Sequence, residues 1–307
     1  LAQKYAGSYD DWEGLEEWLY KEGFPYKHVI IDEGQDFALL PSKEEGDRNV
    51  EIIDELREAA LQSGGTFYLF YDRNQAIQRN RTYELPSYIA DSDCRLTLYQ
   101  NCRNTSAISQ TSLTPLQLPQ KRWSGSKVID PWSVRVEKPV FHLLDDESLI
   151  VETVNKVLDD LQAKDVTDIV LLTVGTMAYT ALRDGLESLD EGADKYWYYC
   201  YKRKRYRMTT AQRFKGLEAT AIIMVDLKPD SFAGKNGMVF YVGASRAKLF
   251  LDFVAVIPEG EYKNVIQSVK ETEPVNKSAK RLRNVIQDLF HARVEDTRLS
   301  SISEMNP

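Results

Sequence analysis

Residues 30–36 read Ile-Ile-Asp-Glu-Gly-Gln-Asp, an apolar run that stops at two adjacent carboxylates. A short apolar run of this kind is typical of a buried parallel strand. Its acids then lie at the carboxyl edge of the sheet, where open α/β sheets bind their ligands. The stretch therefore predicts an α/β fold with a ligand site beside Asp32 and Glu33.

The two acids suit the hydrolysis of a nucleotide phosphate. One carboxylate, Asp32, can hold Mg²⁺ together with the phosphate oxygens. The neighbouring Glu33 can accept a proton from an attacking water molecule. The alternative interpretation is an ordinary turn at the end of a strand, with both acids solvated.

The composition is that of a globular protein, and its negative net charge does not by itself attract nucleic acid. The 307 residues are enough for two domains, and the formal net charge is −8. Any binding to nucleic acid must therefore come from local basic patches. Three cysteines without C-x-x-C spacing fit a reducing compartment, and we expect a cytoplasmic protein. No apolar run is long enough to cross a membrane and no signal peptide is visible, while the initial Leu1 suggests a longer gene product.

Apolar strand-like runs alternate with helical patterns along most of the chain. Strands are expected at 28–32, 66–71, 95–99, 140–144, 168–174, 220–227 and 249–257, and helices at 51–61, 147–162, 178–189, 239–248 and 275–290. This alternation predicts parallel sheets covered on both faces. A proline-rich stretch, 111–139, divides it. We expect a first lobe within 1–110, a connection over 111–139, a second lobe over 140–257 and a helical tail over 258–307.

Two further segments carry groups that suit phosphate chemistry. Thr210-Ala-Gln-Arg-Phe-Lys-Gly-Leu-Glu218 comes directly before a predicted strand and combines a cation, the flexible backbone of Gly216 and a carboxylate. Phe240-Tyr-Val-Gly-Ala-Ser-Arg-Ala247 presents Arg246, and Arg103 follows another predicted strand. A fixed guanidinium stabilises the charge on a phosphoryl group in transfer.

Taken in order, these segments resemble the motifs of the UvrD/Rep-like superfamily 1 helicases. The resemblance covers roughly residues 25–257 and follows the pattern-reading logic of sequence motifs. The matching segments are Asp32–Asp36 (motif II), Asp72–Gln75 (motif III), Leu98–Asn104 (motif IV), Thr210–Glu218 (motif V) and Tyr241–Ala247 (motif VI). The family has two RecA-like lobes with parallel sheets, and the first lobe would be incomplete in this chain. The resemblance implies an ATP-dependent helicase or translocase that moves on single-stranded DNA, with RNA as an open alternative.

The resemblance also implies a role for each matching residue. Asp32 would bind Mg²⁺, Glu33 would activate water, and Gln35 and Gln75 would sense the γ-phosphate of ATP. Arg103 and Arg246 would contact that phosphate from the side of the second lobe. The nucleotide would further be bound by Asp72, Gly216 and Glu218, with Glu218 bonding the ribose or helping to close the cleft. The single strand would be contacted by Thr210, Gln212, Lys215 and Arg81.

Two departures from the family pattern bear on activity. The family's phosphate-binding loop, G-x-x-x-x-G-K-[ST], does not occur, since Gly234-Lys235 is followed by Asn236 and preceded by Pro229 at the position of the first glycine. We therefore expect the P-loop in a missing N-terminal region of the same chain or in a partner chain, and little ATP hydrolysis by this chain alone. The second departure is Asn80, which stands where the family places a base-stacking aromatic residue. The competing hypothesis is a helicase-derived interaction or regulatory module without catalysis.

A basic and aromatic segment, 197–207, has two compatible interpretations. Lys202 and Arg203, close to several tyrosines, suit attraction to a nucleic-acid backbone with base stacking. The alternative is a β-hairpin with an aromatic core face and a solvated basic face. The three histidines, His28, His142 and His291, are isolated in the sequence, and we assign them no ligand role.

Overall fold

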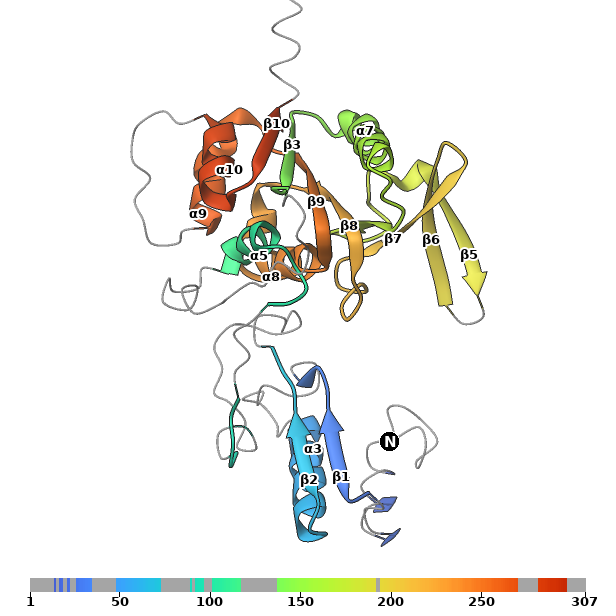
Figure 1. The fold of residues 1–307 in the computed structure, drawn as a ribbon, viewed down its shortest axis with the longest axis vertical. Helices are drawn as coiled ribbons and strands as arrows, with labels where there is room; N and C mark the ends of the chain where they lie inside the picture. Colours follow the sequence, from blue (N-terminus) through green and yellow to red (C-terminus); the bar gives the residue numbers. More distant parts are fainter. Residues whose placement is uncertain are drawn as a thin grey trace, which may run out of the picture. The chain divides into compact units, whose positions relative to one another are not determined.

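The structure is a computed structural model, and it describes residues 14, 17, 18, 21, 22, 26–34, 48–72, 89, 92–96, 101–116, 137–191, 194–269 and 281–296. Side chains are described at these positions except at 48–52 and 190–196. The chain divides into two compact units, Leu1–Thr97 and Leu98–Pro307. Each unit is described separately, with the elements labelled in Figure 1.

The first unit contains a parallel β-α-β arrangement. Its elements are β1 (His28–Ile31), α3 (Arg48–Gln62) and β2 (Thr66–Leu69). The two strands pair in parallel, with His28 opposite Thr66 and Ile31 opposite Leu69. Gly65 is required before β2, because a Cβ atom there would lie 1.4 Å from the carbonyl oxygen of Lys27. Both strands and the helix agree with the expected elements.

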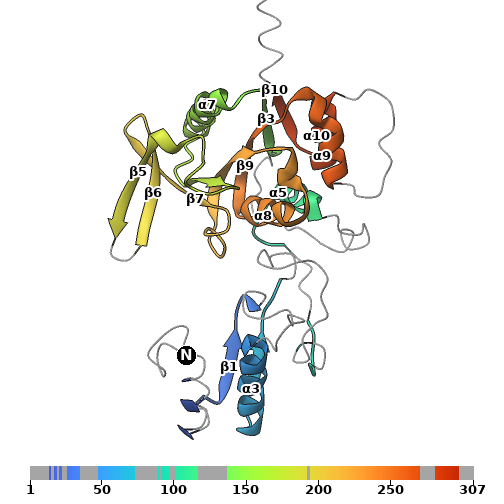
Figure 2. The ribbon, with the colours of Figure 1, turned by 180° about the vertical axis from the view of Figure 1, so that it is seen from behind.

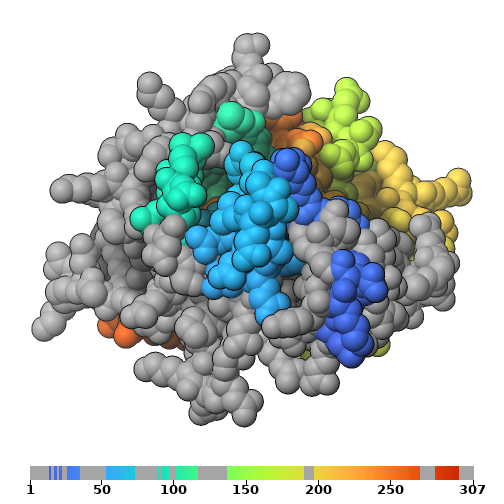
Figure 3. Space-filling view, turned by 90° about the horizontal axis from the view of Figure 1, so that it is seen from below, coloured from blue at the N-terminus to red at the C-terminus, as the bar shows by residue number. Residues whose placement is uncertain are grey.

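Only one face of this small sheet is packed by α3. The helix buries Ile53, Leu56 and Ala60. The side chains on the other face stay exposed, since Ile30 is 68% exposed and Tyr68 is 55% exposed. The described residues of β1, α3 and β2 are drawn in shades of blue in Figure 3. Because parallel sheets are normally covered on both faces, the exposed face is unusual for the arrangement.

The second unit contains an eight-stranded sheet of order β10-β3-β9-β8-β4-β7-β6-β5. Its strands are β3 (Val140–Leu144), β4 (Ile169–Thr173), β5 (Leu186–Glu191), β6 (Asp194–Tyr201), β7 (Lys204–Thr210), β8 (Ala219–Leu227), β9 (Ala247–Val256) and β10 (Arg293–Asp296). The neighbours from β10 to β7 pair in parallel, whereas β6 pairs antiparallel with both β5 and β7. The predicted α/β class with a mostly parallel sheet is confirmed at this level.

Helices cover both faces of the large sheet, as Figures 1 and 2 show from opposite sides. The helices are α5 (Ser106–Leu113), α7 (Ile150–Ala163), α8 (Gly234–Ala244), α9 (Tyr262–Val269) and α10 (Leu282–Phe290), with short 3-10 turns at Thr114–Leu116, Glu147–Leu149, Arg183–Gly185, Pro229–Phe232 and Glu259–Glu261. Alternate residues of the strands divide between two cores. Leu171 and Ile223 join the core under α7, while Leu172 and Ile222 join the core under the other helices.

The helix expected over 178–189 is wrong. The described chain there makes turns, then the 3-10 turn Arg183–Gly185, and then strand β5. β5 pairs antiparallel with β6, with Leu186 opposite Tyr199. A Cβ atom on Gly185 would lie 2.6 Å from the Tyr199 ring, so the glycine permits this close approach. Pairing with a neighbouring strand therefore overrides the local helical spacing. Similarly, residues 95 and 96 are not in a strand, and 97–99 lie outside the described residues.

The boundary between the units also differs from the expected one. We expect 98–110 in the first lobe and a connection from 111, but the units separate between Thr97 and Leu98. Helix α5 packs in the second unit, where Ile108 and Thr111 are fully buried. The Thr111 hydroxyl donates to the carbonyl oxygen of Phe290 at 2.7 Å. The tail expected to be helical contains α9 and α10 and then adds β10 to the edge of the sheet.

No helix in the described part of the chain is long and apolar enough to cross a membrane.

Candidate functional site

The acids of the first unit lie at one edge of its sheet. Asp32 and Glu33 follow β1 directly, and Asp72 follows β2 by three residues. Because β1 and β2 are parallel and Ile31 lies opposite Leu69, the carboxyl ends of the two strands lie at the same edge of the sheet. The backbone holds them there, since Gly34 donates its N–H to the carbonyl oxygen of Phe70 at 2.8 Å. The predicted edge position of these acids is therefore the observed one.

A tight turn orients the two adjacent carboxylates. The backbone N–H of Glu33 donates to Oδ1 of Asp32 at 2.9 Å. Glu33 has φ of 53°, in the left-handed region that non-glycine residues seldom adopt. Gly34 is buried, and a Cβ atom there would lie 2.5 Å from the Leu69 side chain. Strained turns of this kind are found preferentially at functional sites.

The described residues form no metal site that is complete in protein side chains alone. No group of three or more His, Cys, Asp or Glu side chains in the described part of the chain is arranged to hold a metal ion. A dedicated protein cage is therefore not formed by these residues. Magnesium in nucleotide enzymes commonly uses one or two carboxylates, with phosphates and water as its other ligands. The exposed Asp32 fits that mode.

In the second unit, Glu218 joins two cations. Its Oε2 atom lies 3.0 Å from Nε of Arg103, and its Oε1 atom lies 2.6 Å from Nζ of Lys248. Hydrogen bonding and charge from Lys248, and then from Arg103, hold the pKa of Glu218 below its ordinary value. Arg103 and Glu218 are predicted site residues that the fold brings together. Lys248 is not predicted, and its only signal in the sequence is its position two residues after Arg246.

Arg246, which the resemblance places against the γ-phosphate, is buried in the second unit. The residue is 1% exposed, and its Nε atom donates to the carbonyl oxygen of Val242 at 3.1 Å. Its own carbonyl oxygen accepts the N–H of Ala219 at 3.1 Å, directly after Glu218. Arg246 is therefore buried in the second unit beside the Arg103–Glu218–Lys248 cluster. It lies two residues before Lys248, and its backbone is hydrogen-bonded to the residue that follows Glu218.

An asparagine clamp fixes the segment that carries Arg103. Nδ2 of Asn104 donates to the carbonyl oxygens of Ser245 at 2.8 Å and of Ala247 at 2.6 Å. Oδ1 of Asn101 accepts the backbone N–H groups of Arg103 at 3.0 Å and of Asn104 at 3.2 Å. Neither asparagine is a predicted site residue, although both stand in the motif IV segment. The clamp places the backbone of Arg103 against the turn that contains Arg246.

The motif V residues divide between two edges of the sheet. Thr210 ends β7 opposite Thr173, at the carboxyl end of β4. The connection then runs back to β8, so Glu218 lies at the amino edge. Gln212, Gly216 and Glu218 are exposed, whereas Lys215 is half-buried. The structure therefore brings Glu218 to Arg103 but leaves Thr210 at the opposite edge. The remaining predicted residues, Gln35, Gln75 and Arg81, lie outside the described residues.

The basic and aromatic segment forms the β-hairpin of the alternative interpretation. β6 and β7 pair antiparallel around Lys202 and Arg203, which have φ of 45° and 62°. Nζ of Lys202 lies 2.8 Å from Oδ1 of Asp159 on α7, and this hydrogen bond lowers the pKa of Asp159. The Tyr201 hydroxyl donates to the same carboxylate at 2.9 Å. Lys202 is therefore engaged within the unit, while Arg203 is exposed.

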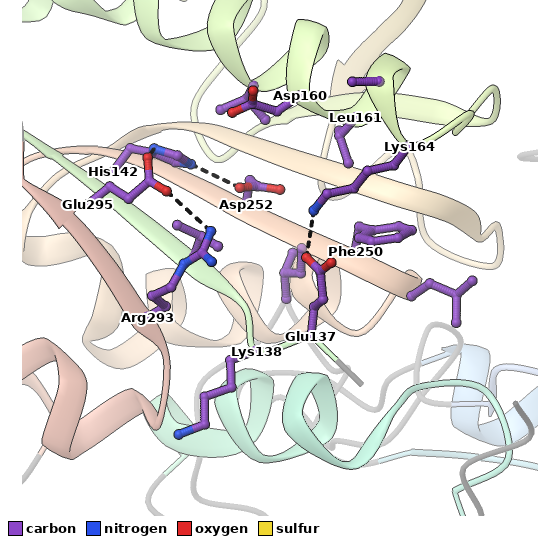
Figure 4. Close-up of a pocket in the computed structure, with 15 residues that line it drawn as sticks. Glu137, Lys138, His142, Asp160, Leu161, Lys164, Phe250, Asp252, Arg293 and Glu295 are labelled. Atoms are coloured by element: carbon purple, nitrogen blue, oxygen red, sulfur yellow. Dashed lines mark hydrogen bonds and ion pairs between the residues drawn. The ribbon is translucent and has the colours of Figure 1, made fainter. Parts of the chain in front are cut away.

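A polar cavity of about 380 Å³ lies between α7 and the amino ends of β3, β9 and β10. Figure 4 shows His142 at its wall between two carboxylates. Nε2 of His142 lies 2.9 Å from Oδ1 of Asp252, and Nδ1 lies 3.5 Å from Oε2 of Glu295. The three residues come from three adjacent strands, and Glu295 is directly opposite His142 in the register. This ladder, in which His142 and Asp252 are buried and Glu295 is half-buried, ties the edge strand β10 to the sheet.

No protein-family model matches the chain, and the curated proteins give no match.

Proposed function

We propose that the chain is a portion of an ATP-dependent DNA helicase or translocase, built on two RecA-like lobes. The observation that carries the proposal is the Arg103–Glu218 contact, which joins residues 115 positions apart in the chain. The asparagine clamp adds a third segment, since Asn104 bonds the backbone on both sides of Arg246. Parts of three segments that resemble motifs IV, V and VI thus lie together at the amino edge of one sheet, which supports a common site, whereas Thr210 of the motif V segment lies at the opposite edge.

In the proposed reaction, the acidic and the basic residues have separate roles. The carboxylate of Asp32 is suited to hold Mg²⁺, which would offset the negative charge of the phosphates of bound ATP. Glu33 would accept the proton of the attacking water. Arg103 would stabilise negative charge on the transferring phosphoryl group, and Arg246 would do so after a rearrangement that exposes it. Hydrolysis would be coupled to movement on single-stranded DNA, with RNA as the alternative strand.

One observation favours a second candidate, a helicase-derived interaction or regulatory module without catalysis. Arg246 is buried, and the charge of Arg103 is offset by Glu218. In addition, residues 1–307 contain no G-x-x-x-x-G-K-[ST] sequence to cradle phosphates. A module that keeps the shape of a nucleotide site without turning ATP over would have these features.

Nucleotide binding by the full chain tests the proposal. A fluorescent ATP analogue with Mg²⁺ is expected to bind and to lose about tenfold in affinity in Arg103→Met, because one charge-assisted hydrogen bond is removed. The control is Arg183→Met, since Arg183 is exposed and its guanidinium donates to the carbonyl oxygen of Ala178. An Arg103 variant that binds like the parent, or a parent that does not bind nucleotide, overturns the proposal.

Turnover separates the two candidates. Because the phosphate-binding loop is absent from these residues, we expect the chain alone to hydrolyse ATP only slowly, with or without single-stranded DNA. Turnover that is restored by a P-loop partner and lost in Glu33→Gln supports the enzyme. Nucleotide binding without turnover in any such mixture supports the regulatory module.

A further inference from the structure

The carboxylate of Glu218 is shared between two cations that come from different elements. Arg103 belongs to the segment before α5, and Lys248 lies at the start of β9. Each cation takes one oxygen, Oε2 for Arg103 at 3.0 Å and Oε1 for Lys248 at 2.6 Å. Two cations that hold two oxygens of one anion make a ready site for a phosphate, whose oxygens are similarly spaced. Glu218 thus takes the position that an anionic ligand would take.

All three side chains can be reached from solvent. The side-chain exposure is 40% for Arg103, 42% for Glu218 and 33% for Lys248. Exposed ion pairs contribute little net free energy, because water screens them and ordering long side chains costs entropy. A ligand with a higher charge density than a carboxylate can therefore displace Glu218. Among the described residues, Glu218 is the only acidic partner of either cation, so its departure leaves a site with two positive charges.

The backbone next to Glu218 permits such a displacement. Gly216 has φ of 81°, and a Cβ atom there would meet nothing within 4 Å, so the turn is open on this side. Residues 216–218 are exposed. The turn is anchored on one side by the buried Phe214 and on the other by Ala219, whose N–H donates to Arg246. A change of conformation can therefore be confined to the four residues between these anchors, 215–218.

We propose that Arg103 and Lys248 form a binding site for the terminal phosphates of a polyphosphate, and that Glu218 occupies this site when the ligand is absent. This inference rests on the proposed nucleotide function and deepens it. It adds Lys248 as a phosphate-binding residue, which the family resemblance does not assign. It also gives Glu218 a second role, as an internal competitor that the ligand must displace. No covalent step is involved, since one anion replaces another.

Calorimetric titration of the full chain with inorganic tripolyphosphate tests this exchange. Glu218→Gln removes the competing charge and is expected to tighten binding about fivefold, the equivalent of one exposed ion pair. Lys248→Met is expected to weaken binding about tenfold, because a charged donor is lost. The chain offers a matched control pair, since Lys228 and Glu147 form an exposed contact of 2.7 Å elsewhere in the same unit. Lys228→Met and Glu147→Gln are expected to change the affinity less than twofold.

Two results overturn the proposal: Glu218→Gln binding tripolyphosphate no more tightly than the parent, or Lys248→Met binding it equally well. Lys248→Arg keeps the charge and is expected to retain affinity, so a misfolded Lys248→Met protein would not obscure the result. Comparison with ATP separates this inference from the proposed function. If the tripolyphosphate results hold but ATP binds no more tightly than tripolyphosphate, the anion site stands and the nucleotide function fails. If ATP binding depends on Arg103 but is unchanged in the Lys248 and Glu218 variants, the nucleotide function stands and the anion site fails.

Discussion

The side-chain amide of Asn104 lies 2.6 Å from the carbonyl oxygen of Ala247, a residue 143 positions later in the chain. The same nitrogen lies 2.8 Å from the carbonyl oxygen of Ser245, and Asn104 is 2% exposed. Buried backbone carbonyls need a donor, and these two obtain it from one side chain. The segment before α5 is therefore a structural part of the turn around Arg246.

Asn104→Leu is expected to destabilise the protein, because it keeps the volume but removes both donors. Two buried carbonyl groups would lose a hydrogen bond, and the free energy of unfolding should fall by about 2–4 kcal/mol. Urea denaturation measures the change. The control is Asn236→Leu, since the Asn236 amide is exposed and donates to the carbonyl oxygen of Asp230 at 3.2 Å. Its expected loss is under about 0.5 kcal/mol. Similar losses in the two variants would contradict the role given to Asn104.

The pair of His142 and Asp252 provides a second prediction. Asp252 is 9% exposed, and the imidazole of His142 lies 2.9 Å from it. His142→Leu leaves the carboxylate without this partner and should cost about 3 kcal/mol of stability. The double variant His142→Leu with Asp252→Leu should recover most of that loss, because an apolar pair can replace a buried polar pair.

A double-mutant cycle from denaturation curves checks this expectation. A coupling energy of at least about 1 kcal/mol is expected for groups in direct contact. If the two single losses simply add in the double variant, His142 and Asp252 are not coupled across β3 and β9.

Sequence patterns predicted the buried strands well, because a parallel strand covered on both faces reads as a continuous apolar run. Strand 140–144 matches β3, and 220–227 differs from β8 by one residue at its start. The patterns failed where a partner strand decides the conformation. Leu182, Leu186 and Leu189 have helical spacing, yet the last two lie in β5. Helix α5 was missed because its sequence is mostly Ser, Thr and small residues, which give no clear apolar stripe.

The candidate site was predictable only where local sequence carries the chemistry. Asp32 and Glu33 interrupt a strand, so their edge position follows from the chain itself. Asn104 could not be predicted, since it contacts Ala247, 143 positions later in the chain. Lys248 could not be predicted either, since it lies on β9 and contacts Glu218, the residue directly before the neighbouring strand β8. The burial of Arg246 likewise results from packing of α8 against β8 and β9. Periodicity within a single segment contains no information about such contacts.

The pH dependence of stability should report the Glu218 cluster. Lys248 and Arg103 lower the pKa of Glu218 in the folded state, so the ionised form stabilises the fold. This contribution is present above the ordinary carboxyl pKa and is lost as the pH falls through the lowered folded-state pKa. Because Glu218 is 42% exposed, its size should stay under about 1 kcal/mol.

Comparison of the parent with Glu218→Gln at several pH values checks the sign. The difference in free energy of unfolding should be largest near neutral pH and should shrink in acid. High salt at neutral pH should reduce it as well, since the contact is exposed to solvent. A difference that grows in acid would contradict the assigned direction of the shift.

The hairpin turn provides a test that separates stability from nucleic-acid binding. Arg203 has φ of 62°, and left-handed backbone costs a non-glycine residue about 1 kcal/mol. Two-residue hairpin turns with both residues in this region favour Asn-Gly. Arg203→Gly is therefore expected to raise the free energy of unfolding by about 0.5–1 kcal/mol. A lower stability would show that the exposed guanidinium makes a contact that the fold needs.

The same variant tests the strand contact implied for Arg203. If Arg203 meets a phosphate, Arg203→Gly should bind a single-stranded oligonucleotide more weakly in fluorescence anisotropy while being more stable. Arg205→Gly is the contrasting control, because Arg205 lies within β7 and pairs with Glu187 at 3.2 Å. Glycine inside a strand should lower stability there by about 0.5–1 kcal/mol. Weaker binding in the more stable Arg203 variant cannot be attributed to unfolding, so it would identify the hairpin tip as part of the nucleic-acid interface. Unchanged binding would leave the hairpin as a structural extension of the sheet.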